Sequence, residues 1–213
     1  MYQANLTETQ RQYIKKALHI QERKRKYDLR EVWNGIFYLV KTGSQCRMLP
    51  SDFPKRQLAY YYFPRWKEDG TFEEIHENLR DKCRERQKKR RLPSVGLIDS
   101  QNVKTTRVGG ESRGVDGGKK IKGRKRHIIT DIHGLLLTVE IHAANENDGK
   151  AGFRVIKSPG GRFERMKKIY ADGGYRDELE ENVKNDFGWN MEITLRLDKS
   201  TGFKPLTKHW IVE

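Results

Sequence analysis

Two aspartates stand where apolar, strand-like runs end. Asp99 closes the run VGLID at 95–99, and Asp172 follows KKIYA at 167–171. Ligand sites in open sheets lie at the carboxyl ends of strands, so neighbouring strands would bring both carboxylates to one point. Two facing carboxylates repel each other unless a cation lies between them, and oxygen ligands suit Mg²⁺ or Mn²⁺. With a third acid from a nearby helix, this pattern predicts a two-metal site that activates a water or 3′-hydroxyl and stabilises a leaving oxygen.

Other polar residues in the same half of the chain compete for this role. Either aspartate could instead cap a turn or a helix. Asp131 stands beside the turn at 133–134, which indicates a hairpin-turn role, and Asp148 is predicted to cap the helix that follows it. His127 and His142 are interpreted as polar strand residues, because a hard-metal site does not need imidazole.

A basic run, KKIKGRKRH, occupies residues 119–127 and carries six Lys or Arg in nine positions. As a strand it would lay charges along a duplex at phosphate spacing, which gives affinity without reading sequence. The other interpretation is a solvated guard on a sheet edge. The predicted DNA-binding residues are Lys119, Lys120, Lys122, Arg124, Lys125, Arg126 and His127.

The composition indicates a polyanionic partner. The 213 residues include 44 Lys or Arg against 29 Asp or Glu, a net charge of +15. Nucleic acid is the simplest partner for such an excess, although a basic protein without chemistry would share it. Cys46 and Cys83 fit no zinc motif, so a reducing compartment is expected. No signal core or membrane-spanning run is visible, and we expect a cytoplasmic protein.

The first part of the chain, residues 1–92, is predicted to be an all-helical domain. Thr7 and Gln10 form a capping box. Apolar residues spaced as one helix face predict a helix at 29–42, and Gly43 ends it. Further helices are expected at 55–69 and from Thr71 onward. The helices at 29–42 and 55–69 could form a helix-turn-helix-like DNA-binding unit with Lys55, Arg56 and Arg65 near DNA. They could equally pack against the catalytic domain or mediate dimerisation.

The second part, residues 93–213, predicts an α/β or α+β domain with a mixed sheet. A strand at 95–99 precedes a hairpin at 126–132 and 135–142, and residues 105–123 are interpreted as a flexible insertion between them. The remaining predicted elements are a helix from Asp148 to about Ile156, a strand at 167–171, a helix at 175–187, a strand at 191–197 and a last element from about Pro205.

Five separated blocks resemble the transposases of the insertion sequence 5 family. They are the segment MLPSDFPKRQLAYYYFPRWKEDGTFEEI, LIDSQNVK, KKIKGRKRHIITDIHGLLLTVEIHAANENDG, YADGGYRD and GFKPLTKHWIVE, in the family's order. The resemblance implies an RNase H-like mixed sheet flanked by helices, behind a helical N-terminal domain. It also implies a catalytic and metal-binding triad of Asp99, Asp172 and Glu213.

The resemblance implies the reaction and its partners as well. Family members use Mg²⁺ to cut double-stranded DNA at terminal inverted repeats and to join the freed 3′ ends to target DNA. A homodimer on DNA, in the bacterial cytoplasm at the nucleoid, is expected. The family continues past the glutamate with an arginine-rich helix, whereas this sequence ends at Glu213, so we expect impaired activity. The alternatives are a DNA-binding remnant that inhibits transposition, and an RNase H-like nuclease.

Overall fold

The computed structural model describes residues 5–17, 26–105, 112–158, 162–176 and 178–194. The chain divides into two compact units, residues 1–87 and 88–213. Each unit has its own buried apolar cluster, so each is described by itself. No helix in these described ranges is long and apolar enough to cross a membrane.

The N-terminal unit consists of helices. They are α1 (Glu8–Ala17), α2 (Leu29–Thr42), the short 3-10 helix η1 (Cys46–Met48), α3 (Arg56–Glu68) and α4 (Thr71–Arg86). The predicted capping box is confirmed, because the Thr7 and Gln10 side chains each accept a hydrogen bond from the other's backbone N–H. Gly43 ends α2 in the left-handed conformation (φ 66°), which glycine adopts without strain.

Aromatic packing joins α2 to α3 and α4 in this unit. The rings of Trp33 and Trp66 stack with centroids 4.2 Å apart, and Phe72 meets the Trp33 ring edge-on. Val32 and Ile36 complete the buried face of α2 that the apolar spacing predicts. The helices at 29–42 and 55–69 were therefore predicted within one residue of their observed ends.

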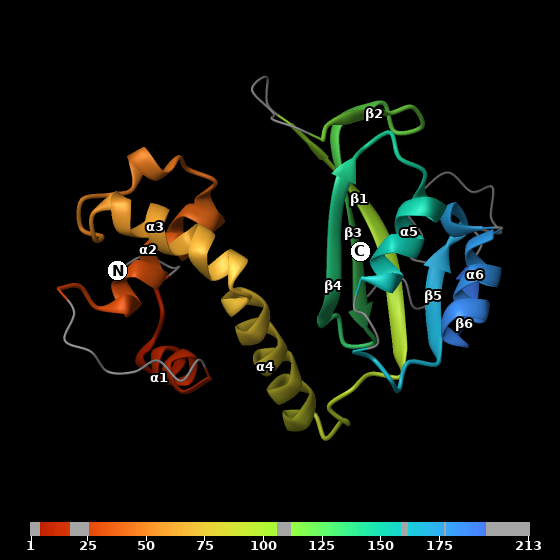
Figure 1. The fold of residues 1–213 in the computed structure, drawn as a ribbon, viewed down its shortest axis with the longest axis horizontal. Helices are drawn as coiled ribbons and strands as arrows, with labels where there is room; N and C mark the ends of the chain where they lie inside the picture. The colour runs from red at the N-terminus through yellow and green to blue at the C-terminus, as the bar shows by residue number, and fades with distance from the viewer. Residues whose placement is uncertain (1–4, 18–25, 106–111, 159–161, 177, 195–213) are drawn as a thin grey trace, which may run out of the picture. The chain divides into compact units, whose positions relative to one another are not determined.

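The second unit is built on one mixed sheet (Figure 1). Its strands are β1 (Val95–Lys104), β2 (Gly114–Asp116), β3 (Ile121–Asp131), β4 (Leu136–Ala143), β5 (Lys168–Asp172) and β6 (Asn190–Thr194). The order is β2-β3-β1-β5-β6, with β4 also paired to β3. β1 runs antiparallel to β3 and parallel to β5, and β5 runs parallel to β6. This is the RNase H-like mixed sheet that the family resemblance implies.

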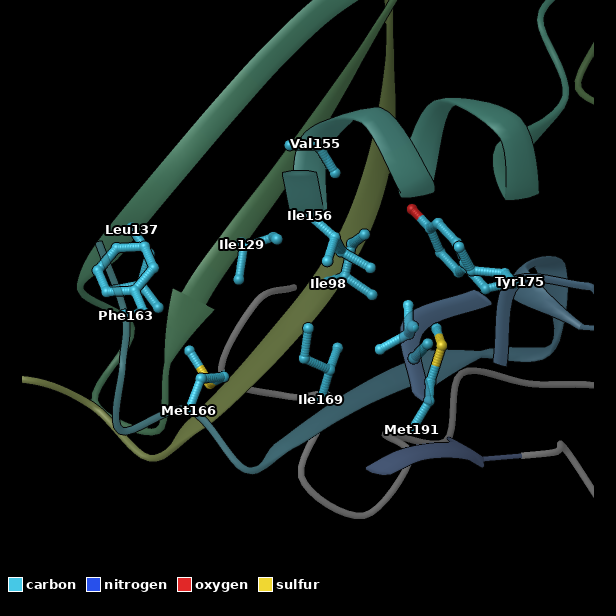
Figure 2. Close-up of a cluster of buried hydrophobic side chains, with 13 residues drawn as sticks. Ile98, Ile129, Leu137, Val155, Ile156, Phe163, Met166, Ile169, Tyr175 and Met191 are labelled. Carbon is cyan, nitrogen blue, oxygen red and sulfur yellow. The ribbon is translucent and has the colours of Figure 1, made fainter. Parts of the chain in front are cut away.

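Two helices, α5 (Asp148–Lys157) and α6 (Glu178–Phe187), cover one face of this sheet. Figure 2 shows the apolar cluster between the helices and the sheet, where Ile98, Ile129 and Ile169 from three strands pack against Val155 and Ile156 of α5. Since side chains alternate along a strand, these isoleucines fix which positions point toward the helices. We call this the helix-covered face, and the opposite side the second face.

Three sequence expectations were wrong in detail. Residues 105–123 are not a simple insertion, because β2 and the start of β3 lie within them and pair antiparallel. β1 continues to Lys104 rather than ending at Asp99, because its polar second half pairs with the basic half of β3. The helix expected at 175–187 begins at Glu178, after a 3-10 turn, η2 (Gly173–Tyr175).

Candidate active site

Asp99 and Asp172 stand on neighbouring strands, just beyond the residues through which those strands pair. β1 and β5 pair in parallel up to Leu97 and Tyr170, and the same register continued by two residues would place Asp99 beside Asp172. Ile98 and Ala171 are buried in the cluster under the helices, so their neighbours Asp99 and Asp172 belong to the second face. The sequence prediction that neighbouring strands bring these two acids together is consistent with this register.

Both carboxylates fit a hard divalent cation. Each aspartate is half-buried, and each carboxylate offers oxygen ligands of the kind that such a cation prefers. In the described part of the chain, no group of three His, Cys, Asp or Glu side chains is placed to hold a metal ion. The third predicted ligand, Glu213, lies outside the described residues. The described part of the site therefore consists of two acids, and a cation bound by them would accept further oxygen ligands.

The turn after β5 fixes the Asp172 side chain. Asp172 Oδ1 accepts a hydrogen bond of 2.9 Å from the Gly174 N–H at the start of η2. The turn-capping role weighed against a metal role is thus real, but it uses one oxygen and leaves the other for a ligand. A Cβ atom at Gly174 would lie 3.1 Å from Asp172 Oδ1 and 3.4 Å from Asp148 Oδ2, so glycine keeps this corner clear.

The basic run on β3 is divided between the two faces. Lys119 and Lys120 lie exposed in the turn before β3, and Lys122 and Arg126 are exposed on the strand. The pairing Gln101 with Arg126 and Asp99 with Ile128 puts Lys122, Arg124 and Arg126 on the second face, with the acids. Arg126 donates a hydrogen bond to Gln101, two residues along β1 from Asp99.

The interleaved residues Lys125 and His127 point the other way, and the prediction that they contact DNA needs correction. Lys125 is 4% exposed and His127 is fully buried, both on the helix-covered face. Lys125 Nζ donates to Asp148 Oδ1 at 2.8 Å and approaches Asp116 Oδ2 at 3.5 Å. A local run of charge indicated phosphate contacts, but strand alternation buries Gly123, Lys125 and His127 of that run.

Asp148 is the acceptor in this buried cluster rather than the predicted helix cap. Asn147 caps α5, since its side chain accepts from the Gly149 and Lys150 N–H groups. Burial alone would raise the pKa of the Asp148 carboxyl, but hydrogen bonds from His127 and Lys125 and the lysine charge lower it to about 2. Asp148 is therefore ionised at neutral pH and compensates the buried lysine.

The remaining polar candidates have structural roles. Asp131 Oδ1 accepts from the His133 and Leu135 N–H groups, which confirms the predicted hairpin-turn role. His142 is a buried strand residue beside His127, with ring centroids 4.8 Å apart. Tyr175 was not singled out from the sequence, yet its buried hydroxyl lies 3.2 Å from His127 Nδ1. Its position directly after the GG pair that follows Asp172 was the one available signal.

Comparison with protein families identifies both halves of the chain. A family described as "Putative transposase of IS4/5 family" matches residues 6–76. A second family, described as "Transposase DDE domain", matches residues 90–213, which is more than half of the sequence. The chain belongs to the DDE transposase family. The predicted resemblance to insertion sequence 5 transposases is confirmed at the level of the IS4/5 family, whose model matches the N-terminal region. Among curated proteins, none matches this transposase.

Solved structures with similar chains are also transposases. One is a piggyBac transposase synaptic complex with hairpin DNA (16% identity, TM-score 0.34), of which the match covers 24% of that chain and 51% of this one. The Mos1 strand transfer complex has 14% identity and a TM-score of 0.30, with 59% and 81% covered. The Mos1 mariner paired-end complex with Mn has 11% identity and a TM-score of 0.29, with 66% and 86% covered. This transposase spans only part of those chains.

The ion pair of Asp148 predicts an acid-sensitive contribution to stability. Asp148→Asn should lower the free energy of unfolding at pH 7 by about 2 kcal/mol, because it removes the nearer of the two carboxylates beside the buried Lys125 and leaves only Asp116. The folded pKa of Asp148 lies below its ordinary value, so the contribution is complete above about pH 4 and is lost as pH falls toward 2.

Urea unfolding at pH 7 and pH 3 measures this effect. The difference between the intact chain and Asp148→Asn should shrink by about half at pH 3. Asp186→Asn, an exposed aspartate of α6, is the matched control and should change stability little at either pH. A difference that is the same at both pH values would contradict the assigned ion pair.

Proposed function

We propose that this transposase binds the terminal inverted repeats of an insertion element, cleaves the DNA there and joins the freed 3′ ends to target DNA. The observation that carries the proposal is one sheet face that holds Asp99 and Asp172 on neighbouring strands, with Lys122, Arg124 and Arg126 on the strand beside Asp99. Acids that hold a cation and bases that bind phosphates are the two requirements of phosphoryl transfer on DNA.

Asp99, Asp172 and, by its motif, Glu213 are the proposed catalytic residues and would hold Mg²⁺ or Mn²⁺. The chemistry that a bound divalent cation supplies is activation of a water or 3′-hydroxyl and stabilisation of the leaving oxygen. The part of the protein is to hold the carboxylates in position. Asp172 is held by the Gly174 N–H, and Asp99 by its place in the centre of a five-strand path.

The second face of β3 is the proposed phosphate-binding surface. Lys122 and Arg126 are exposed there, and Lys119 and Lys120 extend it through the turn that precedes the strand. Charges at alternate strand positions contact the backbone of a duplex and position it without selecting a base sequence. This surface places a bound strand beside the two acids on the same face of the same sheet.

The helical domain, residues 1–92, is the proposed element for recognition of the repeats and for assembly. Arg65 of α3 donates a hydrogen bond to the Tyr61 hydroxyl, and Lys55, Arg56 and the ring of Tyr60 are exposed on or next to the same helix. Exposed aromatic and basic side chains together suit a nucleic acid surface. Because joining requires two ends to be brought together, we propose that the protein acts as a homodimer on DNA.

Cleavage of the element's own end tests the function. The chain, with Mg²⁺ or Mn²⁺ and a labelled duplex bearing that end, should nick the DNA, and Asp99→Asn or Asp172→Asn should reduce the rate about 10²–10³-fold. Asn keeps the side-chain size and removes the charge. Asp186→Asn on α6 is the control and should cleave normally.

Each departure from this result has a distinct meaning. Binding without cleavage with either metal would identify a DNA-binding remnant that inhibits transposition. Cleavage that needs no paired ends and yields no joined product would identify an RNase H-like nuclease. Cleavage that persists in both variants would contradict the assignment of the two aspartates.

The two faces of β3 should respond differently to removal of charge. Lys122→Ala combined with Arg126→Ala should weaken DNA binding and reduce the slope of log K against log salt by roughly 0.9 for each phosphate that the protein no longer neutralises. Fluorescence anisotropy at several salt concentrations measures the slope. Lys184→Ala, exposed on α6, is the charge control. Lys125→Met should lower stability and leave the slope unchanged; an equal change of slope in this variant would contradict the division into faces.

A further inference from the structure

A buried chain of polar groups runs from α5 to the acids' own strands. Asp148 Oδ1 lies 3.3 Å from His127 Nε2, and His127 Nδ1 lies 3.2 Å from the Tyr175 hydroxyl. The Tyr175 hydroxyl is also hydrogen-bonded to the Ser100 side chain. Tyr175 is 1% exposed and His127 is fully buried, so solvent does not replace these contacts.

The geometry of these contacts orients the Tyr175 hydroxyl. The His127 ring lies between two polar groups, with Nε2 at 3.3 Å from the Asp148 carboxylate and Nδ1 hydrogen-bonded to the Tyr175 hydroxyl at 3.2 Å. Burial, followed by the charge of Asp148, raises the pKa of Tyr175, so the phenol stays protonated and its hydroxyl keeps one direction.

The hydrogen-bonded groups at Tyr175 belong to the two segments that directly follow the two acids. Ser100 directly follows Asp99 on β1, and Tyr175 closes the η2 turn whose Gly174 N–H donates to Asp172. The Tyr175 hydroxyl therefore links the segment after Asp99 to the segment after Asp172. In Figure 2 the Tyr175 ring lies at the edge of the apolar cluster, and its oxygen is directed toward α5.

Packing leaves the Tyr175 ring no room to turn away. A Cβ atom at Gly152 of α5 would lie 2.9 Å from two carbons of the ring, so the ring packs directly against the helix backbone. The His127 ring meets it edge-on, with centroids 5.7 Å apart. A ring clamped in this way transmits its position to the backbone of η2 and so to Asp172.

We propose that the Tyr175 hydroxyl, oriented by His127 and Asp148, is a positioning group that sets the spacing of Asp99 and Asp172 and so the affinity of the site for a divalent cation. This inference rests on the proposed metal role of the two aspartates. None of the three residues touches the reacting atoms, so their effect passes through the carboxylates. Groups that orient metal ligands in this way typically contribute about 10–100-fold in metal affinity.

Binding of Mn²⁺ to the full chain, measured by electron paramagnetic resonance of the free ion, tests the proposal without relying on DNA cleavage. Tyr175→Phe keeps the ring and removes the hydroxyl, and it should weaken Mn²⁺ binding about 10-fold. Tyr62→Phe makes the same chemical change in the helical unit and should leave Mn²⁺ binding unaltered. Circular dichroism and the thermal midpoint should show that both variants are folded at the temperature of the titration.

A double-variant cycle separates positioning from general loss of structure. Asp148→Asn should also weaken Mn²⁺ binding, and adding it to Tyr175→Phe should weaken binding by less than the product of the single effects, because both act through one hydroxyl. Multiplicative effects, or unaltered binding in Tyr175→Phe, would overturn the positioning role.

The same titration distinguishes this failure from failure of the proposed function. Asp99→Asn and Asp172→Asn must each weaken Mn²⁺ binding if the aspartates are metal ligands. If they do so while Tyr175→Phe binds normally, the inference is wrong and the metal site stands. If no variant differs from the intact chain, or the intact chain takes up no Mn²⁺, the proposed function and the inference both fail.

Discussion

Two neighbouring carboxylates repel each other, and the parallel pairing of β1 with β5, which ends two residues before Asp99 and Asp172, directs both acids to one face of the sheet. The strands cannot separate without breaking the centre of the sheet, where Ile98 and Ile169 are fully buried. The apolar core therefore compensates for the repulsion at the site until a cation joins the two acids. Strand order, core and basic surface can all be understood from this requirement.

The β3 strand meets two demands with one alternating sequence. Its outward charges, such as Lys122 and Arg126, face the side of the sheet that carries the acids. Its inward polar residues, Lys125 and His127, are buried and are compensated by Asp148 at the start of α5. One strand thus both presents positive charge to a polyanion and fixes the helix that supports the turn after Asp172.

Local sequence patterns predicted what depends on neighbours along the chain. The apolar runs before Asp99 and Asp172 end where strands approach the site, and the order of motifs identified the RNase H-like fold and the transposase family. The capping box and the spacing of α2 also depend only on nearby residues, and both were predicted correctly. The catalytic roles of the acids remain predictions.

The roles that the sequence did not predict are those that depend on contacts between residues far apart in the chain. The charge density of 119–127 does not reveal which residues turn inward until the register with β1 is known, so Lys125 and His127 were assigned to the wrong surface. Asn147 and Asp148 are both good helix caps, and only the position of Lys125 assigns the acid to the ion pair. The sequence did not indicate a role for Tyr175, because its hydroxyl meets His127 only through the turn that η2 makes.

Anomalous diffraction from crystals containing Mn²⁺ tests the central claim most directly, because the claim concerns where a cation binds. We predict a peak within coordination distance of carboxylate oxygens of both Asp99 and Asp172, on the second face of the sheet. A peak at the buried histidines His127 and His142, or no peak near the paired aspartates at saturating Mn²⁺, would contradict the account.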